Sequence, residues 1–483
     1  MTINECAGGS DNPIIIQGGM GAGVSNWMLA RAVSLRGQLG VVSGTVIDTI
    51  FVRRLQDGDV GGHLRRAMAH FPNPAVAAAA LKRYFHPEGR PPGVPYKALP
   101  MYKQKVSAAR QQITVLAGFA EVWLAKEGHK HPVGINLLTK VQMPNLATLY
   151  GAMLAGAEVV LMGAGIPREI PGALDALAVH QPAVIRMDVE GTSDAEYLSF
   201  DPADHGMPST PLLRPKFFPI VAATSLATTL ARKANGRVDG FVIEGPTAGG
   251  HNAPPRGEMK LSEAGEPLYG ERDVVDLSRI RELGLPFWLA GGVGSPAGLR
   301  TALDAGAAGI QVGTLFAFAD EAGILADLKT EVLAGVEQGA VTVRTDPRAS
   351  PTGYPFKLVA LPGGDYQSPT RERVCDLGYL RVSYRKPDGG VGYRCPAEPV
   401  DAYVAKGGAI EDTVGRRCLC NALTANIGLG QLRPDGVDEK PLLTSGDDLV
   451  GMSRFLQGRT RYSAADVIDY LLAGTTERVA AQT

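Results

Sequence analysis

The sequence predicts an α/β fold, a (β/α)8 or TIM barrel with a helical insertion and an irregular C-terminal appendage. Short runs of almost continuously apolar residues recur through the first part of the chain, as expected of parallel strands buried on both faces. Helical patterns occupy most of the intervals between these runs. Repeated strand–helix units over roughly 310 residues are typical of a barrel or a doubly wound sheet. The hydrophobic fraction of 45% is sufficient for a large core.

More segments qualify as strands than the eight that a closed barrel needs. The candidates are Pro13–Gln17, Leu39–Ser43, Val133–Asn136, Glu158–Met162, Ala183–Asp188, Phe217–Ala222, Val238–Ile243, Phe287–Ala290 and Gly309–Val312. The surplus strand is either Ala183–Asp188 or Phe217–Ala222, because residues 190–216 between them have the composition of a loop. Helices are expected at Trp27–Leu35, Leu146–Ala155, Thr224–Lys233 and Pro296–Ala305, the last with Ser295 as its N-cap.

Three segments interrupt the strand–helix alternation. Residues 45–131 are too long for one crossover and contain helical patterns, so they are predicted to be an insertion in a barrel that spans residues 1–345. Residues 346–448 are rich in Gly, Pro and Arg and are predicted to be an irregular appendage. Residues 449–483 are expected to form a C-terminal helical segment that packs on the barrel, with a helix at Ala464–Leu472.

Charge and composition exclude several classes of protein. The 48 basic and 49 acidic residues leave a net charge of -1, which argues against a dedicated nucleic-acid surface. No apolar run reaches the ~20 residues of a membrane span. The first residues, MTINECAGGSDN, lack the basic and apolar regions of a secretory signal. We therefore expect a cytoplasmic protein that binds neither nucleic acid nor membrane.

Glycine turns end two successive strands near the end of the predicted barrel. LAGGVGSPAGL places Gly291 and Gly292 between a strand and a helix, and QVGTLFA places Gly313 and Thr314 at the end of the next strand. Bare backbone N–H groups and the positive end of a helix dipole bind anions. Barrels commonly bind phosphate after strands seven and eight, so these two turns predict a phosphate cradle.

A histidine follows the glycine pair in IEGPTAGGHNAPPRG. Gly249 and Gly250 would let the backbone approach a planar ligand, and His251 would lie at the rim where barrels place their active sites. Imidazole titrates near neutrality, so His251 is a candidate general acid or base.

Two further motifs lie at the carboxyl ends of early strands. IIIQGGMGAGVSN resembles a dinucleotide fingerprint, but the acidic residue expected ~20 positions later on a second strand is missing. A cofactor ring lying over the backbone of Gly19 and Met20 fits this stretch better. GINLL places Asn136 at the end of a strand, where its side chain would face the same site.

In their order along the chain, these motifs resemble those of the nitronate monooxygenase family, formerly called 2-nitropropane dioxygenases. The chain is also similar to the flavin-dependent enoyl-acyl carrier protein reductases, which share that barrel. The resemblance covers residues 12–322 and implies an FMN-dependent enzyme in which His251 is the catalytic residue. The flavin contacts that it implies are Gly19, Met20, Asn136, Glu244, Gly249, Gly250, Gly291, Gly292, Gly313 and Thr314.

The chain departs from the family pattern around the substrate. The family usually has E-A-G-G-H-R-G, whereas Thr247 here replaces the Glu and residues 252–255 precede Arg256. The resemblance implies oxidation of an alkyl nitronate with O2. The alternative is NAD(P)H-dependent reduction of an enoyl thioester, and the insertion favours such a bulky substrate. From other classes, a phosphate-sugar isomerase and a non-catalytic FMN-binding module stay open, as does assembly into a homo-oligomer.

Four of the five cysteines, Cys375, Cys395, Cys418 and Cys420, lie in the appendage. They could bind zinc or an iron–sulfur cluster through four thiolates. Their spacing lacks the C-x2-C pairs that are typical of zinc ribbons. Scattered reduced thiols and no metal are therefore the prediction.

Overall fold

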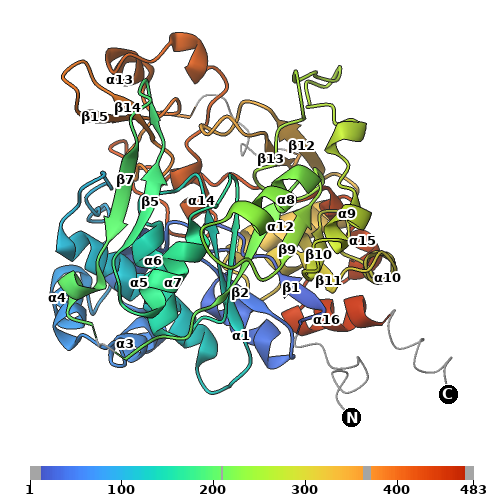
Figure 1. Cartoon of the computed structure of the whole chain (residues 1–483), viewed down its shortest axis with the longest axis horizontal. Helices are drawn as coiled ribbons and strands as arrows, with labels where there is room; N and C mark the ends of the chain where they lie inside the picture. The colour runs from blue at the N-terminus through green and yellow to red at the C-terminus, as the bar shows by residue number, and fades with distance from the viewer. Residues whose placement is uncertain (1–11, 208–209, 363–370, 474–483) are drawn as a thin grey trace.

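Eight parallel strands form the centre of the molecule (Figure 1). The structure is a computed structural model, and it describes residues 12–207, 210–362 and 371–473. The strands follow the order β1-β11-β10-β9-β8-β4-β3-β2. Their bounds are β1 Ile15–Gln17, β2 Gly40–Ser43, β3 Val133–Leu138, β4 Val159–Gly163, β8 Lys216–Val221, β9 Phe241–Glu244, β10 Phe287–Ala290 and β11 Gly309–Val312. β1 and β2 also meet, through a parallel bridge between Ile16 and Leu39. The predicted TIM-barrel fold is confirmed.

The surplus strand is Ala183–Asp188. It becomes β5 (Ala183–Met187), which pairs with β7 (Glu196–Phe200) in an antiparallel hairpin outside the barrel. Buried and exposed residues alternate along β5, whereas β4 is buried throughout. Alternation of this kind marks a strand with one face in solvent. Phe217–Ala222 corresponds to β8, which pairs with β4 and β9 inside the barrel.

Helices surround the barrel and cover its strands. Their bounds are α1 Trp27–Leu35, α6 Asn145–Leu154, α7 Ile170–Ala178, α8 Thr224–Lys233, α9 Leu277–Arg281, α10 Pro296–Asp304, α11 Thr314–Ala317 and α12 Ala326–Glu337. Ser295 caps α10 as predicted, because its hydroxyl accepts a hydrogen bond from Gly298 N–H. The expected C-terminal helix is α16 (Ala464–Leu472), which begins with a capping box and packs against α1 and α10.

Residues 45–131 contain four α-helices. These are α2 Ile47–Gln56, α3 His63–Met68, α4 Pro74–Tyr84 and α5 Ala108–Lys126. The 19-residue α5 packs lengthwise against α6 and also contacts α1, α2, α3 and α4. A buried ion pair joins α2 to α5, with Arg110 Nη1 2.7 Å from Asp48 Oδ2. Tyr379, from the C-terminal part of the chain, donates its hydroxyl proton to the same carboxylate.

Two antiparallel hairpins and three short helices follow the barrel. The hairpins are β12–β13 (Thr342–Asp346 and Phe356–Ala360) and β14–β15 (Val382–Arg385 and Val391–Arg394), and the helices are α13 Val400–Ala405, α14 Leu419–Ala425 and α15 Ser453–Leu456. β14 also pairs in parallel with the two-residue β6 (Val189–Glu190), which comes from the excursion between β4 and β8. Most of this segment lies above the barrel in Figure 1, on the side where the cavity described below opens.

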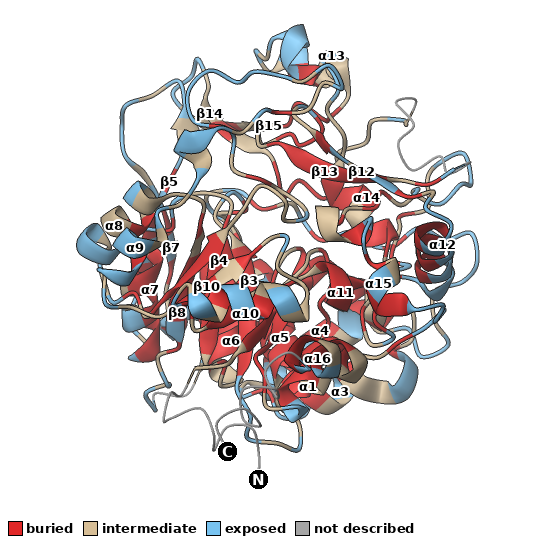
Figure 2. Cartoon of the chain, turned by 90° about the vertical axis from the view of Figure 1, so that its right-hand side faces the viewer, coloured by how far each residue is buried: buried red, intermediate tan, exposed pale blue. Residues whose placement is uncertain are grey.

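The buried residues concentrate in the barrel and in the helices around it (Figure 2). The interior of the barrel is filled by Ile16, Leu39, Val41, Leu161, Phe218, Val242 and Trp288, which pack as one cluster. Because this filling closes the centre of the barrel, a ligand can enter only at the ends of the strands. Among the described residues, no helix is both long and apolar enough to cross a bilayer.

Candidate active site

A cavity of about 670 Å³ opens at the carboxyl ends of the barrel strands. Each of the eight strands, or the loop that directly follows it, contributes residues to the lining. The C-terminal segment closes the opposite side with residues such as Tyr354, Phe356, Leu419 and Thr444. The cavity therefore occupies the position at which barrel enzymes bind their substrates, and its volume is that of a cofactor-binding cleft.

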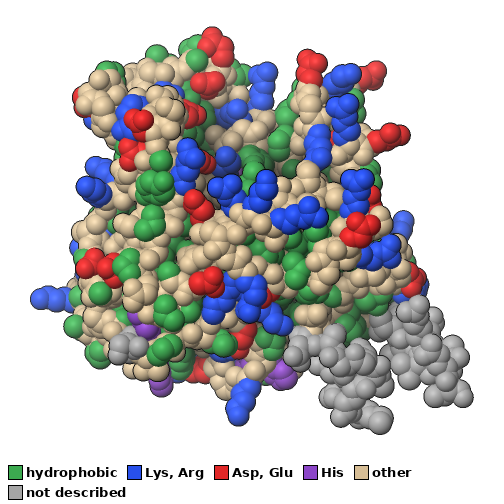
Figure 3. Space-filling view, in the orientation of Figure 1, with side chains coloured by type: hydrophobic (Ala, Val, Ile, Leu, Met, Phe, Trp, Pro, Cys, Tyr) green, Lys and Arg blue, Asp and Glu red, His purple; other side chains and the backbone are tan. Residues whose placement is uncertain are grey.

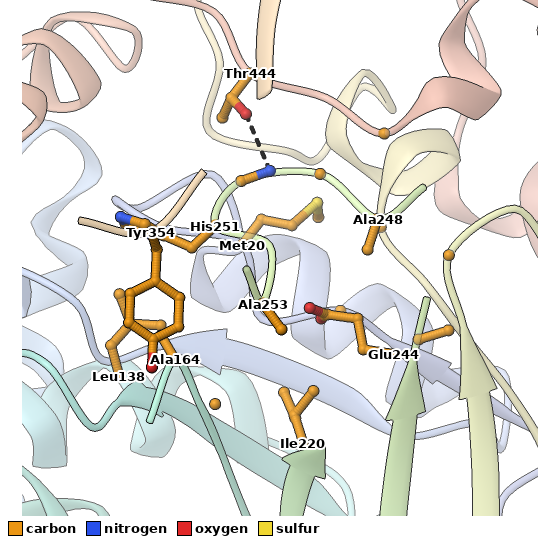
Figure 4. Close-up of a pocket in the computed structure, with 18 of the residues that line it drawn as sticks. Met20, Leu138, Ala164, Ile220, Glu244, Ala248, His251, Ala253, Tyr354 and Thr444 are labelled. Carbon is orange, nitrogen blue, oxygen red and sulfur yellow. Dashed lines mark hydrogen bonds between the residues drawn. The ribbon is translucent and has the colours of Figure 1, made fainter. Parts of the chain in front are cut away.

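All eleven residues singled out in the sequence line this one cavity. They are Gly19, Met20, Asn136, Glu244, Gly249, Gly250, His251, Gly291, Gly292, Gly313 and Thr314. They come from the ends of β1, β3, β9, β10 and β11, which are dispersed over almost 300 residues of sequence. The close-up in Figure 4 shows Met20, Glu244 and His251 around a shared space.

The turn between β10 and α10 requires glycine. Gly291 and Gly292 have φ angles of +84° and +70°, which L side chains rarely adopt. A Cβ on Gly291 would also lie 2.9 Å from the backbone nitrogen of Ala248. The backbone of the loop after β9 therefore packs directly against the backbone of the turn after β10. Residues of both segments line the cavity.

Asn136 holds the loop after β1. Its Nδ2 donates a hydrogen bond of 2.9 Å to the carbonyl of Gly19. A Cβ on Gly19 would lie only 2.2 Å from Asn136 Cβ, so the close approach of β3 to this loop depends on glycine. The Oδ1 atom of Asn136 is buried and has no partner among the described residues. An unpaired buried acceptor that lines a cavity suits a ligand with an N–H group.

His251 is fixed by residues of the C-terminal segment. Its Nε2 lies 2.7 Å from Ser350 Oγ, and its ring packs edge-on against Phe356 with the ring centres 4.8 Å apart. Desolvation lowers the pKa of His251 to about 4. The imidazole is therefore neutral at physiological pH and can donate or accept a hydrogen bond without carrying charge.

Glu244 ends β9 and points into the cavity (Figure 4). Desolvation raises the pKa of its carboxyl to about 8. Glu244 is therefore protonated at neutral pH. A carboxylic acid in an apolar cavity can donate a hydrogen bond or a proton, which a carboxylate cannot do.

Several lining residues were not predicted, and the C-terminal segment contributes many of them. Thr444 Oγ1 accepts a hydrogen bond from Gly250 N–H, and Gly446 N–H donates one to Thr314 Oγ1. The buried hydroxyl of Ser445 has no partner among the described residues. No local pattern in the sequence marked these residues. Gln311 could have been found, because it lies on β11 two positions before Gly313, and the alternation of a strand directs its side chain toward the same side.

Asp448 lies at the predicted phosphate cradle. Its carboxylate accepts a hydrogen bond from Gly294 N–H, just before α10 begins. Desolvation raises the pKa of Asp448, and the neighbouring Asp447 raises it further. A charged carboxylate here would repel a phosphate, whereas a protonated one would not.

The lining fits a flavin with a phosphate. Unpaired acceptors at Asn136 Oδ1 and Gln311 Oε1 suit the N–H groups of a polar ring, and the glycine backbones of residues 249–250 and 291–292 leave room for a flat ligand. The dipole of the nine-residue α10 favours an anion at its N-terminus. The Asp448 carboxyl also lies at this end, near Gly292 and Gly294, with Asp447 as its acidic neighbour.

Part of the chain matches a known family. Residues 126–347 match the family model described as nitronate monooxygenase. No curated protein matches the chain.

Similar solved structures include FabK from Thermotoga maritima, with 16% identity over 98% of this chain and 95% of that chain and a TM-score of 0.46. A nitroalkane oxidase from Streptomyces ansochromogenes has 15% identity over 98% of both chains and a TM-score of 0.45. The enoyl reductase domain of MlnA from the macrolactin biosynthesis cluster of Bacillus amyloliquefaciens has 11% identity, covers 97% and 96%, and has a TM-score of 0.44. Residues 126–347, a little under half of the chain, therefore resemble the nitronate monooxygenase family, and the chain is a flavin-dependent oxidoreductase.

Proposed function

We propose that the chain binds FMN in this cavity and oxidises an alkyl nitronate with O2. One observation carries the proposal, namely that all eleven motif residues line one cavity. The barrel segment from which most of them come also matches the family model. A bound FMN would supply the redox chemistry, taking electrons from the substrate and passing them to O2. The phosphate would lie at Gly291–Gly292 and Gly313–Thr314, where backbone N–H groups and the α10 dipole favour an anion.

His251 would bind the substrate as a neutral group. Because its pKa is lowered to about 4, the ring cannot stabilise the anionic nitronate by a full positive charge at neutral pH. It can instead donate a hydrogen bond to the nitro oxygen or move a proton. Nε2 is held by Ser350 Oγ, and Nδ1 has no hydrogen bond within the part of the chain that the structure describes. Nδ1 is therefore the atom available to the substrate.

Positive charge near the cavity supports an anionic substrate. Lys140 Nζ lies 5.5 Å from the ring centre of Tyr354, which lines the cavity. On the face shown in Figure 3, Lys and Arg side chains lie across the upper half, interspersed with Asp and Glu. Such charges raise the local concentration of an anion although the whole chain is nearly neutral.

A second candidate, reduction of an enoyl thioester with NAD(P)H, is favoured by the apolar wall of the cavity. Leu138, Val141, Ile166, Ile220 and Leu226 all line it. This apolar surface would suit an acyl chain better than a small nitroalkane. In this case Glu244, protonated because its pKa is about 8, is a second proton donor beside His251.

Anaerobic reduction separates the two candidates. The FMN-loaded protein is mixed without oxygen with a nitronate, and in a second sample with NADPH, while the visible flavin absorbance is recorded. Bleaching by the nitronate supports the proposal, and bleaching by NADPH alone supports the reductase. His251→Ala is expected to keep FMN and lose turnover, whereas the exposed His131→Ala is the matched control and should retain activity. Unchanged turnover in His251→Ala would contradict the assigned role.

A further inference from the structure

Two hydroxyl groups extend the hydrogen bonding of His251 away from the large cavity. Nε2 of His251 lies 2.7 Å from Ser350 Oγ, and Ser350 Oγ lies 2.8 Å from Thr352 Oγ1. Both distances are those of well-formed hydrogen bonds. An imidazole and two hydroxyls can each donate and accept a proton, so the three side chains form one continuous hydrogen-bonded chain.

The two ends of this chain lie in different cavities. His251 lines the large cavity at the barrel mouth, whereas Thr352 lines a second cavity of about 350 Å³. Ser350, which stands between them, is completely buried. Exposed charged side chains, among them Arg186 and Asp188, also line the second cavity, so water reaches it. The hydrogen-bonded chain therefore leads from the candidate active site, through the interior, to solvent.

Residues 350–355 contribute to the walls of both cavities. Tyr354 lines the large cavity, and its ring centre lies 6.5 Å from that of His251 (Figure 4). Thr352 is only two residues earlier and lines the second cavity. The backbone N–H of Tyr354 donates a hydrogen bond of 3.4 Å to Thr352 Oγ1, which helps to hold this hydroxyl in line with the chain.

The hydrogen-bonding capacity of Ser350 suits the transfer of a proton. A hydroxyl has one donor and two acceptor sites. The backbone N–H of Thr352 donates to Ser350 Oγ at 3.2 Å and occupies one acceptor site. One donor and one acceptor site are left for His251 on one side and the Thr352 hydroxyl on the other. When the donor and the acceptor exchange roles in both bonds, one proton has moved along the chain.

His251 needs such an exit for a proton at its second nitrogen. Desolvation lowers its pKa to about 4, so a ring with protons on both nitrogens is unfavourable at neutral pH. A proton that Nδ1 takes from a ligand must therefore leave from Nε2, and a proton that Nδ1 gives must be replaced there. A ligand that fills the large cavity excludes water from it, so the exchange with solvent has to pass through the protein.

We propose that Ser350 and Thr352 relay protons between His251 and water in the second cavity. The inference rests on the proposed function, in which the substrate exchanges a proton with His251 Nδ1. One proton enters the ring at Nδ1, the Nε2 proton moves to Ser350, the Ser350 proton moves to Thr352, and the Thr352 proton moves to water. The reverse sequence supplies a proton to the substrate, and no electrons move in either direction. Ser350 and Thr352 do not touch the substrate and act through His251.

Variants of Thr352 separate a relay from a structural role. Thr352→Val removes the hydroxyl but leaves Ser350 in place to hold His251. We expect kcat on the nitronate to fall by at least about tenfold, with KM and the Kd of FMN unchanged. Thr352→Ser retains a hydroxyl and should restore kcat. Thr228→Val is the matched control and should keep activity, because this half-buried hydroxyl donates to the Thr224 carbonyl and lines neither cavity.

Exchange of the His251 Nε2 proton with water tests the relay without turnover. The rate is measured by NMR of protein labelled with ¹⁵N-histidine, and His251→Ala identifies the signal. Exchange should be slower in Thr352→Val than in the wild type and should recover in Thr352→Ser. Unchanged kcat or unchanged exchange in Thr352→Val would overturn the proposal, and so would a Thr352→Ser protein as slow as Thr352→Val. A wild-type protein without turnover would instead contradict the proposed function, and the exchange rates alone would then decide on the relay.

Discussion

At the scale of the residue, two ionisable groups in the cavity have pKa values shifted in opposite directions by the same cause. Desolvation raises the pKa of Glu244 to about 8 and lowers that of His251 to about 4, so that both are uncharged at neutral pH. Burial always favours the neutral form, which is the acid for a carboxyl and the base for an imidazole. Two neutral groups that can each pass a proton suit a site where electrons and protons move together.

Glu244→Gln tests the carboxyl through stability. The pKa of Glu244 is raised on folding, so its contribution is fully present below the unfolded value of about 4.5 and is lost as the pH rises through about 8. In urea denaturation, the wild-type protein should therefore lose stability between about pH 4.5 and about pH 8. The Gln variant should show a smaller loss over the same range. An equal loss in both proteins would place the titrating group elsewhere.

Asp448→Asn tests the acidic residue at the phosphate cradle. Removing a carboxylate that can charge beside a phosphate should tighten FMN binding by about 1 kcal/mol, roughly fivefold in Kd, with the largest gain at high pH. Riboflavin lacks the phosphate, so its affinity should not change. Fluorescence titration with both ligands measures this difference. An equal gain for riboflavin and FMN would show that Asp448 is not near the phosphate.

At the scale of the element, a buried ion pair joins two of the inserted helices, α2 and α5. Asp48 on α2 and Arg110 on α5 are almost inaccessible to solvent, and Tyr379 joins them to the C-terminal segment. Asp48 also accepts a hydrogen bond from the Thr114 hydroxyl. The pKa of Asp48 is lowered because the partners outweigh the opposing effect of burial, which acts to raise it. The pair therefore links two helices of the insertion to the cavity wall that contains Tyr379.

Arg110→Leu should cost about 3–5 kcal/mol of unfolding free energy, because it leaves the Asp48 carboxylate buried without its partner. Arg66→Leu is the matched control, since it breaks a partly exposed ion pair with Glu127 and should cost about 1 kcal/mol or less. Urea denaturation of the three proteins compares these costs. Equal losses in both variants would mean that burial does not govern the contribution of the pair.

At the scale of the whole molecule, the residues of the site come from two kinds of segment, which are motifs at strand ends and an irregular C-terminal segment. Residues such as Gly291, Asn136 and His251 belong to motifs at strand ends, and one strand–turn–helix unit is enough to predict where each will lie. Thr444, Ser445 and Asp448 come from a segment without regular periodicity, and only tertiary packing brings them to the cavity. The surplus strand is marked in the sequence only by Arg186, because the other exposed residue of β5, Val184, is apolar.

The most direct test of the account is whether the purified chain binds FMN at the predicted glycine turns. After incubation with FMN and removal of the unbound ligand, the wild-type protein should keep about one FMN per chain by visible absorbance. Gly291→Ala should lose it, because φ is +84° there and a Cβ would collide with Ala248. Gly339→Ala, at an equally unusual φ of +64° but in open space, is the control for backbone strain and should keep it. A wild-type protein with no flavin absorbance would contradict the central claim, and so would a Gly291→Ala variant that binds FMN as well as the control.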